Sequence, residues 1–415
     1  MTEFKNVAVI GLGYIGLPTA AILAAQGVRV HGVDVNDRTI DAVNAGKVPF
    51  VEPDLAGFVS EAVSKGMLSA SKETPAADAF IVAVPTPFQE DHSADLSYIE
   101  AAAKSLAPRL TGTELVVLES TSPPHSTRHM ADVILAARPD LREDTEDAPG
   151  LLFAHCPERV LPGRVMVELV SNDRIVGGST PRAAEAAKAL YQMFCQGEIL
   201  LTDDATAEMA KLVENSFRDV NIAFANELSV ICDRLGINVW ELIKLANHHP
   251  RVNILQPGPG VGGHCIAVDP WFIVASAPEE AQLIRQARET NDAKPTWVMG
   301  KVAEAAQQTA ADAPIAALGL AFKANIDDLR ESPAVDIVAR LAAEYPGRRI
   351  LTVEPHVEAL PKQLTGLANV ELSTMDDALE SAPVVVLLVD HQQFRAVDLA
   401  RLAGKGIVDT RGIWN

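Results

Sequence analysis

Cysteine and positive charge are both scarce in this chain of 415 residues, and each shortage excludes a class of protein. The four cysteines lie far apart without a CxxC pair, which argues against a disulfide framework and against a zinc site. Asp and Glu outnumber Lys and Arg by 55 to 35, which gives a net charge of −20. Such a surface repels nucleic acid and anionic membranes, so we expect neither as a partner.

Long apolar runs are missing as well. No run of about 18 apolar residues appears, as a transmembrane helix would need. The first residues, MTEFKNVAVIGLG, enter a predicted strand without the basic and apolar regions of a signal peptide. We therefore expect a cytoplasmic protein. Its 48% hydrophobic and 22% charged residues are typical of a globular enzyme, and its length predicts two or three domains.

A glycine-rich turn follows the first predicted strand, Val7–Ile10. The turn reads GxGxxG, and a helical run (18–26) and a second strand (28–34) come after it. These glycines permit a tight turn and the close approach of a pyrophosphate, whose charge meets the helix N-terminus. Asp34 would bind a ribose 2′-hydroxyl and repel a 2′-phosphate. The pattern predicts a Rossmann domain that binds NAD in preference to NADP.

Two threonines follow further strands of this domain. Strands are predicted at residues 79–84, 115–118 and 152–155, and Thr86 and Thr121 come after the first two. Ligands of open α/β sheets bind at the carboxyl ends of strands, so each threonine is a candidate cofactor contact. The alternative, that each only caps the following helix, is equally compatible with the spacing.

From about Asp203 to Leu245 the apolar spacing predicts a long helix. Lys211, Asn215 and Arg218 stand at i, i+4 and i+7 and share one stripe. This stripe is either a solvated face or a surface directed at an anionic ligand. The predicted packed face consists of Met209, Leu212, Val213, Phe217 and Val220.

The segment GPGVGGHCIAVDP, residues 258–270, has four glycines in six positions. We expect these glycines to serve positive φ angles or a close approach to a ligand rather than packing. Cys265 follows them directly, and Asp269 lies four residues further on. A thiol on such a loop, among backbone N–H groups, is a candidate nucleophile. A surface turn in front of a buried cysteine is the alternative.

Strands and helices alternate again after residue 314. Strands are predicted at 315–320, 349–353, 384–389 and 406–409, with a helix at 332–343. This pattern predicts a second, smaller doubly wound domain without a dinucleotide fingerprint. Lys323, Arg330 and Arg411 follow strand ends, where phosphates are usually held.

Taken in order, the motifs of the chain resemble those of the UDP-glucose/GDP-mannose dehydrogenases over essentially its whole length. The motifs are GLGYIGLP, ESTSP from Glu119, CPER from Cys156, Lys211-x3-Asn215, GVGGHC with Asp269, and GLAFK followed by RESP. Residues 241–274 resemble the branch of this family that acts on UDP-N-acetyl-D-mannosamine. Ala267-Val268 stands where Pro-Lys is usual in UDP-glucose enzymes, and Pro162 replaces a usual acid.

The resemblance implies a four-electron oxidation of a sugar C6 hydroxyl to a carboxylate, with two NAD and one water, for surface polysaccharide biosynthesis. Cys265 would capture the aldehyde as a thiohemiacetal, which is then oxidised to a thioester. UDP-N-acetylglucosamine or another UDP-hexose remains open as the substrate. A non-catalytic regulator that binds NAD and a nucleotide sugar is a more remote alternative.

The resemblance also assigns roles to residues, and we expect no metal site. Catalytic roles go to Cys265, Lys211, Asn215, Asp269, Glu158 and Thr121, and the division of proton transfers among Lys211, Asp269 and Glu158 stays open. NAD contacts are expected from Gly11, Gly13, Tyr14, Ile15, Gly16, Asp34, Thr86, Thr121 and Arg330. UDP-sugar contacts are expected from Arg159, Val160, Lys211, Asn215, Arg218, His249, Arg251, Gly262, Phe322 and Lys323.

We therefore predict an α/β protein of two doubly wound Rossmann-like domains joined by a long central helical region. The predicted divisions are an NAD-binding domain (1–200), a central helical domain with the cysteine loop and oligomer interface (201–300) and a UDP-sugar-binding domain (301–415). The arginine that matches Arg251 reaches a neighbouring subunit's site in the family, which implies a homodimer or a dimer-based oligomer.

Overall fold

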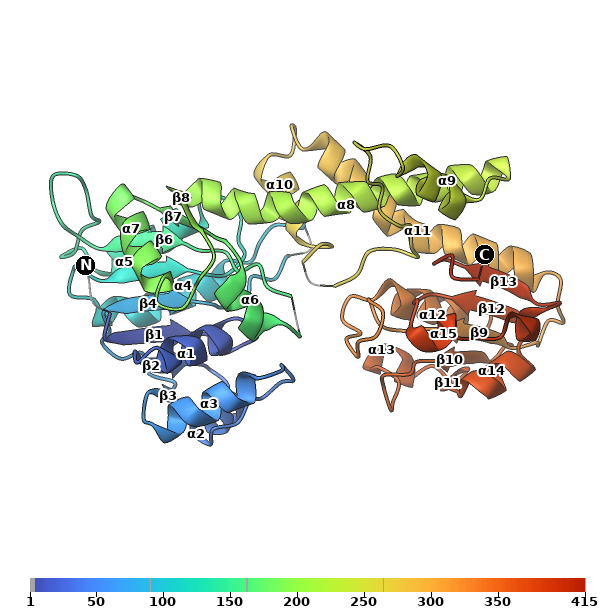
Figure 1. Ribbon diagram of the computed structural model, residues 1–415, viewed down its shortest axis with the longest axis horizontal. Coiled ribbons are helices and arrows are strands. Elements are labelled where there is room, and N and C mark those ends of the chain that lie inside the picture. The colour runs from blue at the N-terminus through green and yellow to red at the C-terminus, as the bar shows by residue number, and fades with distance from the viewer. Residues whose placement is uncertain (1–3, 90, 162, 264, 415) are drawn as a thin grey trace. The chain divides into compact units, whose positions relative to one another are not determined.

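The computed structural model describes residues 4–89, 91–161, 163–263 and 265–414 (Figure 1). Pro162 and His264, which belong to two of the motifs above, lie outside the described residues. The chain divides into two compact units, Met1–Glu214 (unit 1) and Asn215–Asn415 (unit 2). Both contain a sheet with helices, so the predicted α/β class is confirmed. No helix in the described ranges is long and apolar enough to cross a membrane.

Unit 1 is built on an eight-stranded sheet of order β3-β2-β1-β4-β5-β6-β7-β8. The strands are β1 (Asn6–Ile10), β2 (Arg29–Val33), β3 (Leu68–Ser71), β4 (Ala79–Val82), β5 (Leu115–Leu118), β6 (Leu152–His155), β7 (Arg174–Gly178) and β8 (Ile199–Asp203). Only the β6–β7 pairing among them is antiparallel. The order of connections reverses between β1 and β4, which is where open α/β sheets bind their ligands.

Helices cover both faces of this sheet. Alternate residues of β1 point to opposite sides, so Val7 and Val9 join one buried cluster while Ala8 and Ile10 join another. The first cluster packs against α1 (Gly16–Ala25), α2 (Asp37–Asn44), α3 (Leu55–Ser64), α6 (Val165–Ser171) and α7 (Pro181–Tyr191). The second packs against α4 (Ser97–Leu106) and α5 (Ser126–Ala137).

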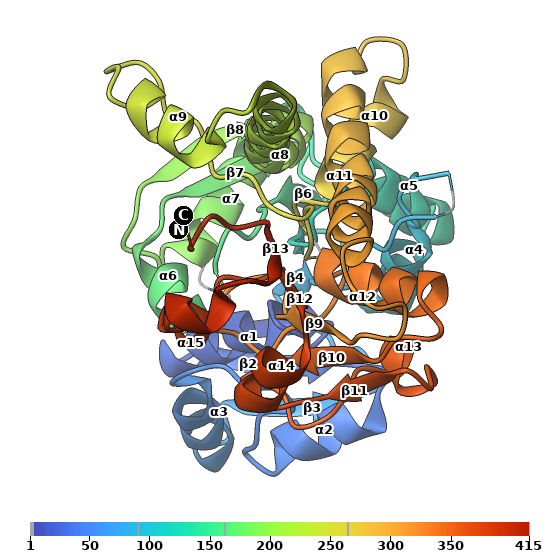
Figure 2. The ribbon, with the colours of Figure 1, turned by 90° about the vertical axis from the view of Figure 1, so that its right-hand side faces the viewer.

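Unit 2 contains a five-stranded parallel sheet of order β11-β10-β9-β12-β13 (Figure 2). Its strands are β9 (Ile315–Leu318), β10 (Ile350–Val353), β11 (Val370–Leu372), β12 (Val384–Leu387) and β13 (Gly406–Asp409). The helix α11 (Gln282–Ala306) and α12 (Pro333–Glu344) pack on one face, and α14 (Met375–Ser381) and α15 (Gln392–Arg395) pack on the other. A short α13 (Lys362–Thr365) precedes β11.

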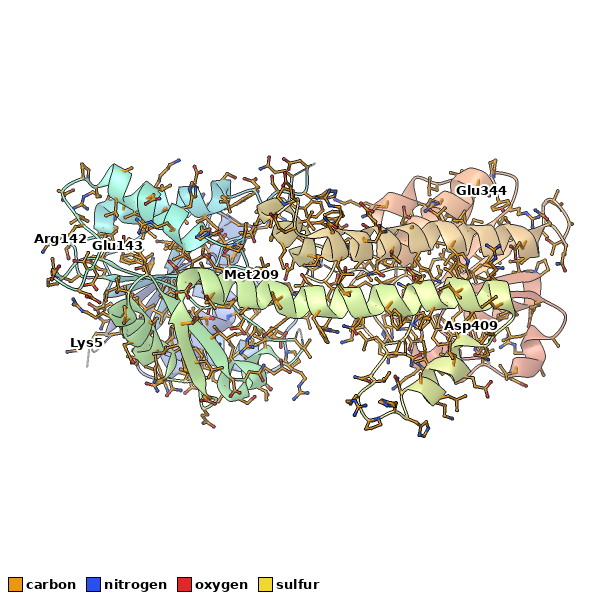
Figure 3. The ribbon with its side chains drawn as sticks, turned by 90° about the horizontal axis from the view of Figure 1, so that it is seen from above. Lys5, Arg142, Glu143, Met209, Glu344 and Asp409 are labelled. Atoms are coloured by element: carbon orange, nitrogen blue, oxygen red, sulfur yellow. The ribbon has the colours of Figure 1, made fainter. Side chains whose placement is uncertain are left out.

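The long helix α8 (Asp204–Leu235) begins in unit 1 and ends in unit 2. Within unit 2 it lies beside α11 (Figure 3), and buried polar pairs join the two helices. The Arg288 guanidinium lies 2.6 Å from Asp219, and the Asn226 amide donates to Asn291 at 2.8 Å. The opposite charges of Arg288 and Asp219 and the hydrogen bond between the two asparagines limit the cost of burying these polar side chains.

Two predictions about this helix are wrong. The helix does not continue to Leu245, because Gly236 takes a positive φ of 68° and Asn238 caps the separate helix α9 (Val239–Ala246). The packed face was also misjudged, since Val213 is 47% and Phe217 is 68% exposed. Helical spacing identifies residues that share a face, but it does not say which face is covered within one chain.

The turns after β1 and β9 have the same geometry although their sequences differ. Gly11 and Gly319 take φ values of 94° and 99°. Asp34 and Glu354, which follow β2 and β10, each accept the N–H of the residue after that glycine, at 2.9 and 2.8 Å. The carboxylate at the end of the second strand therefore holds the glycine turn in place in both domains.

Candidate active site

The glycine turn after β1 leaves open space at the N-terminus of α1. A Cβ on Gly11 would lie 2.4 Å from the Ala83 carbonyl oxygen, and one on Gly16 would lie 1.9 Å from the Gly11 oxygen. Both positions therefore require glycine for packing. A Cβ on Gly13 would have no atom within 4 Å, so backbone is open to a ligand there. This arrangement fits a pyrophosphate at the helix N-terminus.

The other predicted NAD contacts of this region surround the same turn. Asp34 accepts backbone N–H groups with both oxygens, from Leu12 at 2.9 Å and from Asn36 at 2.8 Å, which fixes its orientation. The Tyr14 ring stacks on Phe50 with 4.2 Å between centroids. Ile15 is the residue that precedes the first turn of α1.

Thr86 and Thr121 are brought together at the carboxyl ends of β4 and β5. The Thr86 hydroxyl donates to the Thr121 carbonyl oxygen at 2.5 Å. Neither threonine caps a helix, because the N-cap positions of α4 and α5 are Leu96 and His125. The capping alternative is therefore wrong, and both residues stay candidates for cofactor binding.

Behind these strand ends lies a buried polar cluster that includes Glu158. Its Oε2 lies 2.9 Å from a guanidinium nitrogen of Arg174, and its Oε1 accepts the Arg159 N–H at 2.7 Å. Burial, and secondarily the charge of Glu158, raises the pKa of the neighbouring Glu119 to about 8, although Arg174 opposes this. Arg174 was not predicted as a site residue. Its only signal in the sequence is a charged residue that opens the apolar run RIVGG.

In unit 2 the structure brings together three of the predicted catalytic residues. The Asn215 amide of α8 donates to Asp269 Oδ2 at 2.5 Å, and both residues are buried. Asp269 begins α10 (Asp269–Ser276), and its N–H donates to the Cys265 carbonyl at 2.9 Å. The side chain of Cys265 is exposed, so a buried cysteine behind a surface turn is excluded. Lys211, one turn before Asn215 on α8, is 9% exposed.

Two glycines of the cysteine loop, Gly260 and Gly263, take a positive φ as expected, but the loop glycines also pack closely, which corrects the expectation that packing plays no part. A Cβ on Gly262 would lie 2.5 Å from the Glu331 carbonyl oxygen. Gly263 has a φ of 85° and its Cβ would lie 3.1 Å from the Phe322 ring. The loop therefore lies directly against Phe322, and two predicted sugar-binding residues, Gly262 and Phe322, are neighbours.

Most other residues predicted to bind the substrate or cofactor lie at the surface of their own unit. Arg159 is held by Glu214 at 2.6 Å, and Arg330 by Asp328 at 2.6 Å. Val160 is half-buried. Exposed positions are Arg218, His249, Arg251 and Lys323. Arg411 lies 2.7 Å from Asp390 and touches the position where Gly258 would carry a Cβ.

One cluster in unit 2 has the composition of a metal site, namely Glu354, His356 and His391. His391 Nδ1 accepts the Asn325 N–H at 2.9 Å, so its Nε2 carries the proton that is donated to Glu354 at 3.1 Å. His391 therefore has no lone pair left for a metal. Glu354 of this cluster instead accepts the N–H groups of Leu320 and Ala321 and so holds the turn after β9.

Three family models match the chain in order along its length. They are the NAD-binding domain (residues 5–195), the central domain (205–293) and the UDP-binding domain (316–415) of the UDP-glucose/GDP-mannose dehydrogenase family. The chain belongs to this family. It is an NAD-dependent nucleotide-sugar dehydrogenase, with NAD as its cofactor. The predicted boundaries at residues 200 and 300 stay predictions.

Full-length relatives carry two names. The chain is 57% identical over 415 residues to an NDP-N-acetyl-D-galactosaminuronic acid dehydrogenase of Ralstonia nicotianae, covering 100% of this chain and 97% of the relative. It is 54% identical to the UDP-N-acetyl-D-mannosamine dehydrogenase of Escherichia coli, covering 99% and 100%. Among solved structures, a UDP-D-ManNAc dehydrogenase of Pyrococcus horikoshii matches with a TM-score of 0.87 and 39% identity, covering 98% and 96%.

Proposed function

We propose that the enzyme oxidises the C6 hydroxyl of UDP-N-acetyl-D-mannosamine to a carboxylate, which gives UDP-N-acetyl-D-mannosaminuronate. The substrate is favoured by relatives of that name at 54–56% identity over nearly the whole chain. The chemistry is supported by one structural observation above all. An exposed thiol at Cys265 lies one turn before a buried carboxylate, Asp269, that is itself bonded to Asn215.

In the first oxidation the C6 alcohol becomes an aldehyde and loses a hydride and a proton. NAD, when bound, accepts the hydride in this step and in the second oxidation. Lys211 and Asn215 lie one helical turn apart on α8, so both can donate to the oxygen at C6. Removing one such donor typically costs about 2.7–4 kcal/mol of transition-state stabilisation.

In the second stage the Cys265 sulfur bonds to the aldehyde carbon, and the thiol proton passes to the oxygen. Loss of the second hydride from this carbon, together with the hydroxyl proton, leaves a thioester on Cys265. Water then attacks the thioester carbon, the C–S bond breaks, and the thiol and the carboxylate product are released. Glu158 accepts the proton of that water, and Thr121 stands between this water and the cofactor. Covalent capture keeps the reactive aldehyde from escaping.

We infer that the enzyme acts as a homodimer in the cytoplasm and that its product serves surface polysaccharide biosynthesis. The dimer is supported by α8, which exposes large apolar side chains along one face of the helix. Phe217, Phe224 and Ile231 recur at intervals of seven residues on that face and are all exposed. Apolar residues at this spacing are typical of a helix that packs against another helix.

Complete turnover of UDP-N-acetyl-D-mannosamine should release two NADH for each sugar consumed, measured by absorbance against product quantified by chromatography. A ratio of one would remove the thioester scheme. Cys265→Ser should abolish release of the carboxylate or stop at a covalent ester detectable by mass spectrometry. Cys195→Ser, which changes a buried cysteine of unit 1, is the matched control and should retain the ratio of two.

A second candidate substrate is the corresponding N-acetylgalactosamine nucleotide. It is favoured by the relatives at 56–57% identity whose names refer to N-acetyl-D-galactosaminuronic acid. UDP-N-acetylglucosamine and UDP-glucose are the two further UDP-sugars to be tested beside these candidates. Measuring kcat/KM for all four UDP-sugars under one condition decides the matter, because the best substrate should exceed the others at least tenfold.

A further inference from the structure

The Glu158 carboxylate belongs to a closed polar cluster in unit 1. Arg174, at the start of β7, is its ion-pair partner, and the two side chains are 4% and 7% exposed. The same guanidinium lies over the rings of Tyr191 and Phe194, 4.9 and 5.3 Å from their centroids. A buried arginine packed against two aromatic rings has little freedom to move, so it holds its carboxylate partner in one place.

A second carboxyl group, Glu119, lies in the same cluster at the end of β5 and is 1% exposed. It accepts the Tyr191 hydroxyl at 3.2 Å and the Thr19 hydroxyl at 3.3 Å. These neutral partners stabilise a carboxylate less than a guanidinium does. The two acids therefore differ in environment, and one arginine cannot compensate two buried negative charges equally.

The titratable groups that face Glu158 come from four elements. They are Glu119 after β5, Cys156 after β6, Arg174 on β7 and Tyr191 on α7. Burial raises the pKa of the Cys156 thiol to about 12. Burial also raises the pKa of the Tyr191 hydroxyl well above its ordinary value, so both groups stay neutral. The cluster therefore contains one permanent positive charge and two carboxyl groups.

We propose that Arg174 is a positioning residue for thioester hydrolysis, which holds Glu158 as the charged carboxylate that accepts the proton of water, while Glu119 keeps its own proton. This inference rests on the proposed role of Glu158. It adds that the two buried acids near Arg174 differ in protonation, with Glu158 charged and Glu119 neutral. Without Arg174, Glu158 would be buried without a compensating charge, which disfavours the carboxylate form that accepts a proton.

The first test is the pH dependence of turnover in Arg174→Met and Arg174→Lys. We expect the acid limb of the kcat profile to move up by about 1–3 pH units in Arg174→Met, and by less in Arg174→Lys, which keeps the charge. At pH 7 a covalent adduct on Cys265 should accumulate in Arg174→Met and diminish at pH 9. Arg142→Met changes an exposed arginine and should leave the profile in place. A loss of activity that is equal at all pH values, with native circular dichroism, would overturn the proposal.

The second test needs no substrate and follows Glu119 through stability. A carboxyl group that keeps its proton in the folded protein destabilises the fold as pH rises from its unfolded pKa to its folded pKa. The melting temperature of Glu119→Gln should therefore exceed that of the unchanged enzyme by more at pH 9 than at pH 6. Equal destabilisation at both pH values would mean that Glu119 is ionised, which contradicts the proposal that it keeps its proton.

Glu158→Gln separates this inference from the proposed function. If Glu158→Gln hydrolyses the thioester at the normal rate, the proposed role of Glu158 fails together with the inference. If Glu158→Gln stops at the covalent adduct while Arg174→Met keeps the normal pH profile, only the positioning role of Arg174 is wrong.

Discussion

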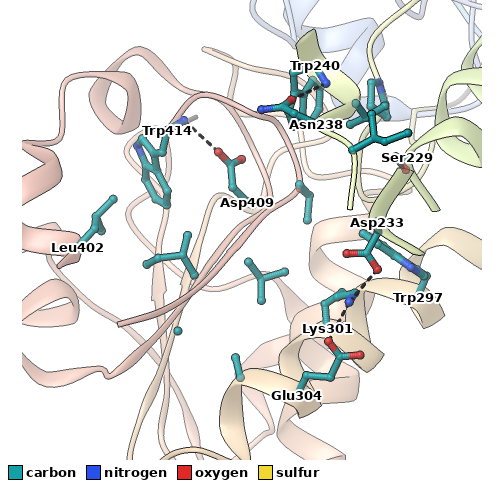
Figure 4. Close-up of a pocket in the computed structure, with 18 of the residues that line it drawn as sticks. Ser229, Asp233, Asn238, Trp240, Trp297, Lys301, Glu304, Leu402, Asp409 and Trp414 are labelled. Atoms are coloured by element: carbon teal, nitrogen blue, oxygen red, sulfur yellow. Dashed lines mark hydrogen bonds and ion pairs between the residues drawn. The ribbon is translucent and has the colours of Figure 1, made fainter. Parts of the chain in front are cut away.

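A buried lysine, Lys294, lines a cavity of about 780 Å³ in unit 2 that contains none of the predicted site residues (Figure 4). Its ammonium group donates to the Ser229 hydroxyl and lies 3.6 Å from the centre of the Trp297 ring. Burial lowers the pKa of Lys294 to about 7, although Asp233 opposes this. At neutral pH this side chain is therefore close to losing its charge.

Lys294 should make the stability of the protein depend on pH. Its pKa is lower in the folded than in the unfolded chain, so the unfolded chain binds more protons between about pH 7 and pH 10.5, and stability rises with pH across that window. Lys294→Met should remove a penalty of at most a few kcal/mol at pH 6. The gain over the unchanged protein should shrink by pH 9. Urea unfolding at pH 6 and pH 9 measures this difference in the free energy of unfolding.

Lys301 in the same cavity is the matched control for this experiment. It lies 2.8 Å from both Asp233 and Glu304, and hydrogen bonds to these carboxylates raise its pKa. Lys301→Met should therefore lack the stabilisation at pH 6. If Lys294→Met instead loses stability equally at pH 6 and pH 9, the contacts with Ser229 and Trp297 outweigh the cost of burying the charge.

The sequence predicted individual site residues when their chemistry stood in a motif. Cys265 was predicted from its glycine-rich loop, whereas the roles of Asp269 and Asn215 came from the family resemblance, and the structure brings the three together. Arg174 was not predicted as a site residue, because an isolated arginine at the start of a strand belongs to no local sequence pattern. Its importance comes from Glu158, 16 residues away in sequence, and only tertiary packing creates that pair.

At the scale of elements, the break between α8 and α9 depends on one glycine. Gly236 has a φ of 68°, which a residue with a Cβ adopts only with strain. Gly236→Ala should therefore destabilise the protein by about 1 kcal/mol. Gly300 is the matched control, for which the opposite effect is expected. It is exposed inside α11, and a Cβ added there would have no atom within 4 Å. Gly300→Ala should stabilise by about 0.5–1 kcal/mol. Thermal unfolding of both variants tests the pair, and equal effects would contradict it.

Buried parallel strands and the glycine turns were predictable because they produce strong local signals. The nine predicted strands match β1, β2, β4, β5, β6, β9, β10, β12 and β13 within a few residues. The strands β3, β7, β8 and β11 were missed. Residues of β3 and β8 are partly exposed, so their sequences lack the continuous apolar run that marks a central strand. The break at Gly236 was missed because apolar spacing continues through it.

At the scale of the whole molecule, the proposed dimer rests on the exposed apolar face of α8. Phe217 and Phe224 are 68% and 52% exposed, and Leu235 near the helix end is 64% exposed. A row of large apolar side chains this exposed costs free energy in water, and a second copy that packs the same face against it would remove that cost. The same face accounts for the wrong prediction of a packed face within one chain, because a helix that packs on another subunit has the same apolar spacing.

Phe224→Glu should therefore convert the protein from a dimer to a monomer of 44.3 kDa. A charge placed in the centre of a two-fold interface is buried twice, once from each subunit, and has no partner there. Sedimentation velocity at micromolar concentration measures the change. Val167→Glu, on α6 of unit 1, alters a side chain that is 53% exposed and lies off α8, and this variant should stay dimeric. If both variants sediment as the unchanged protein does, α8 does not form the interface, and the exposed face must meet a different partner.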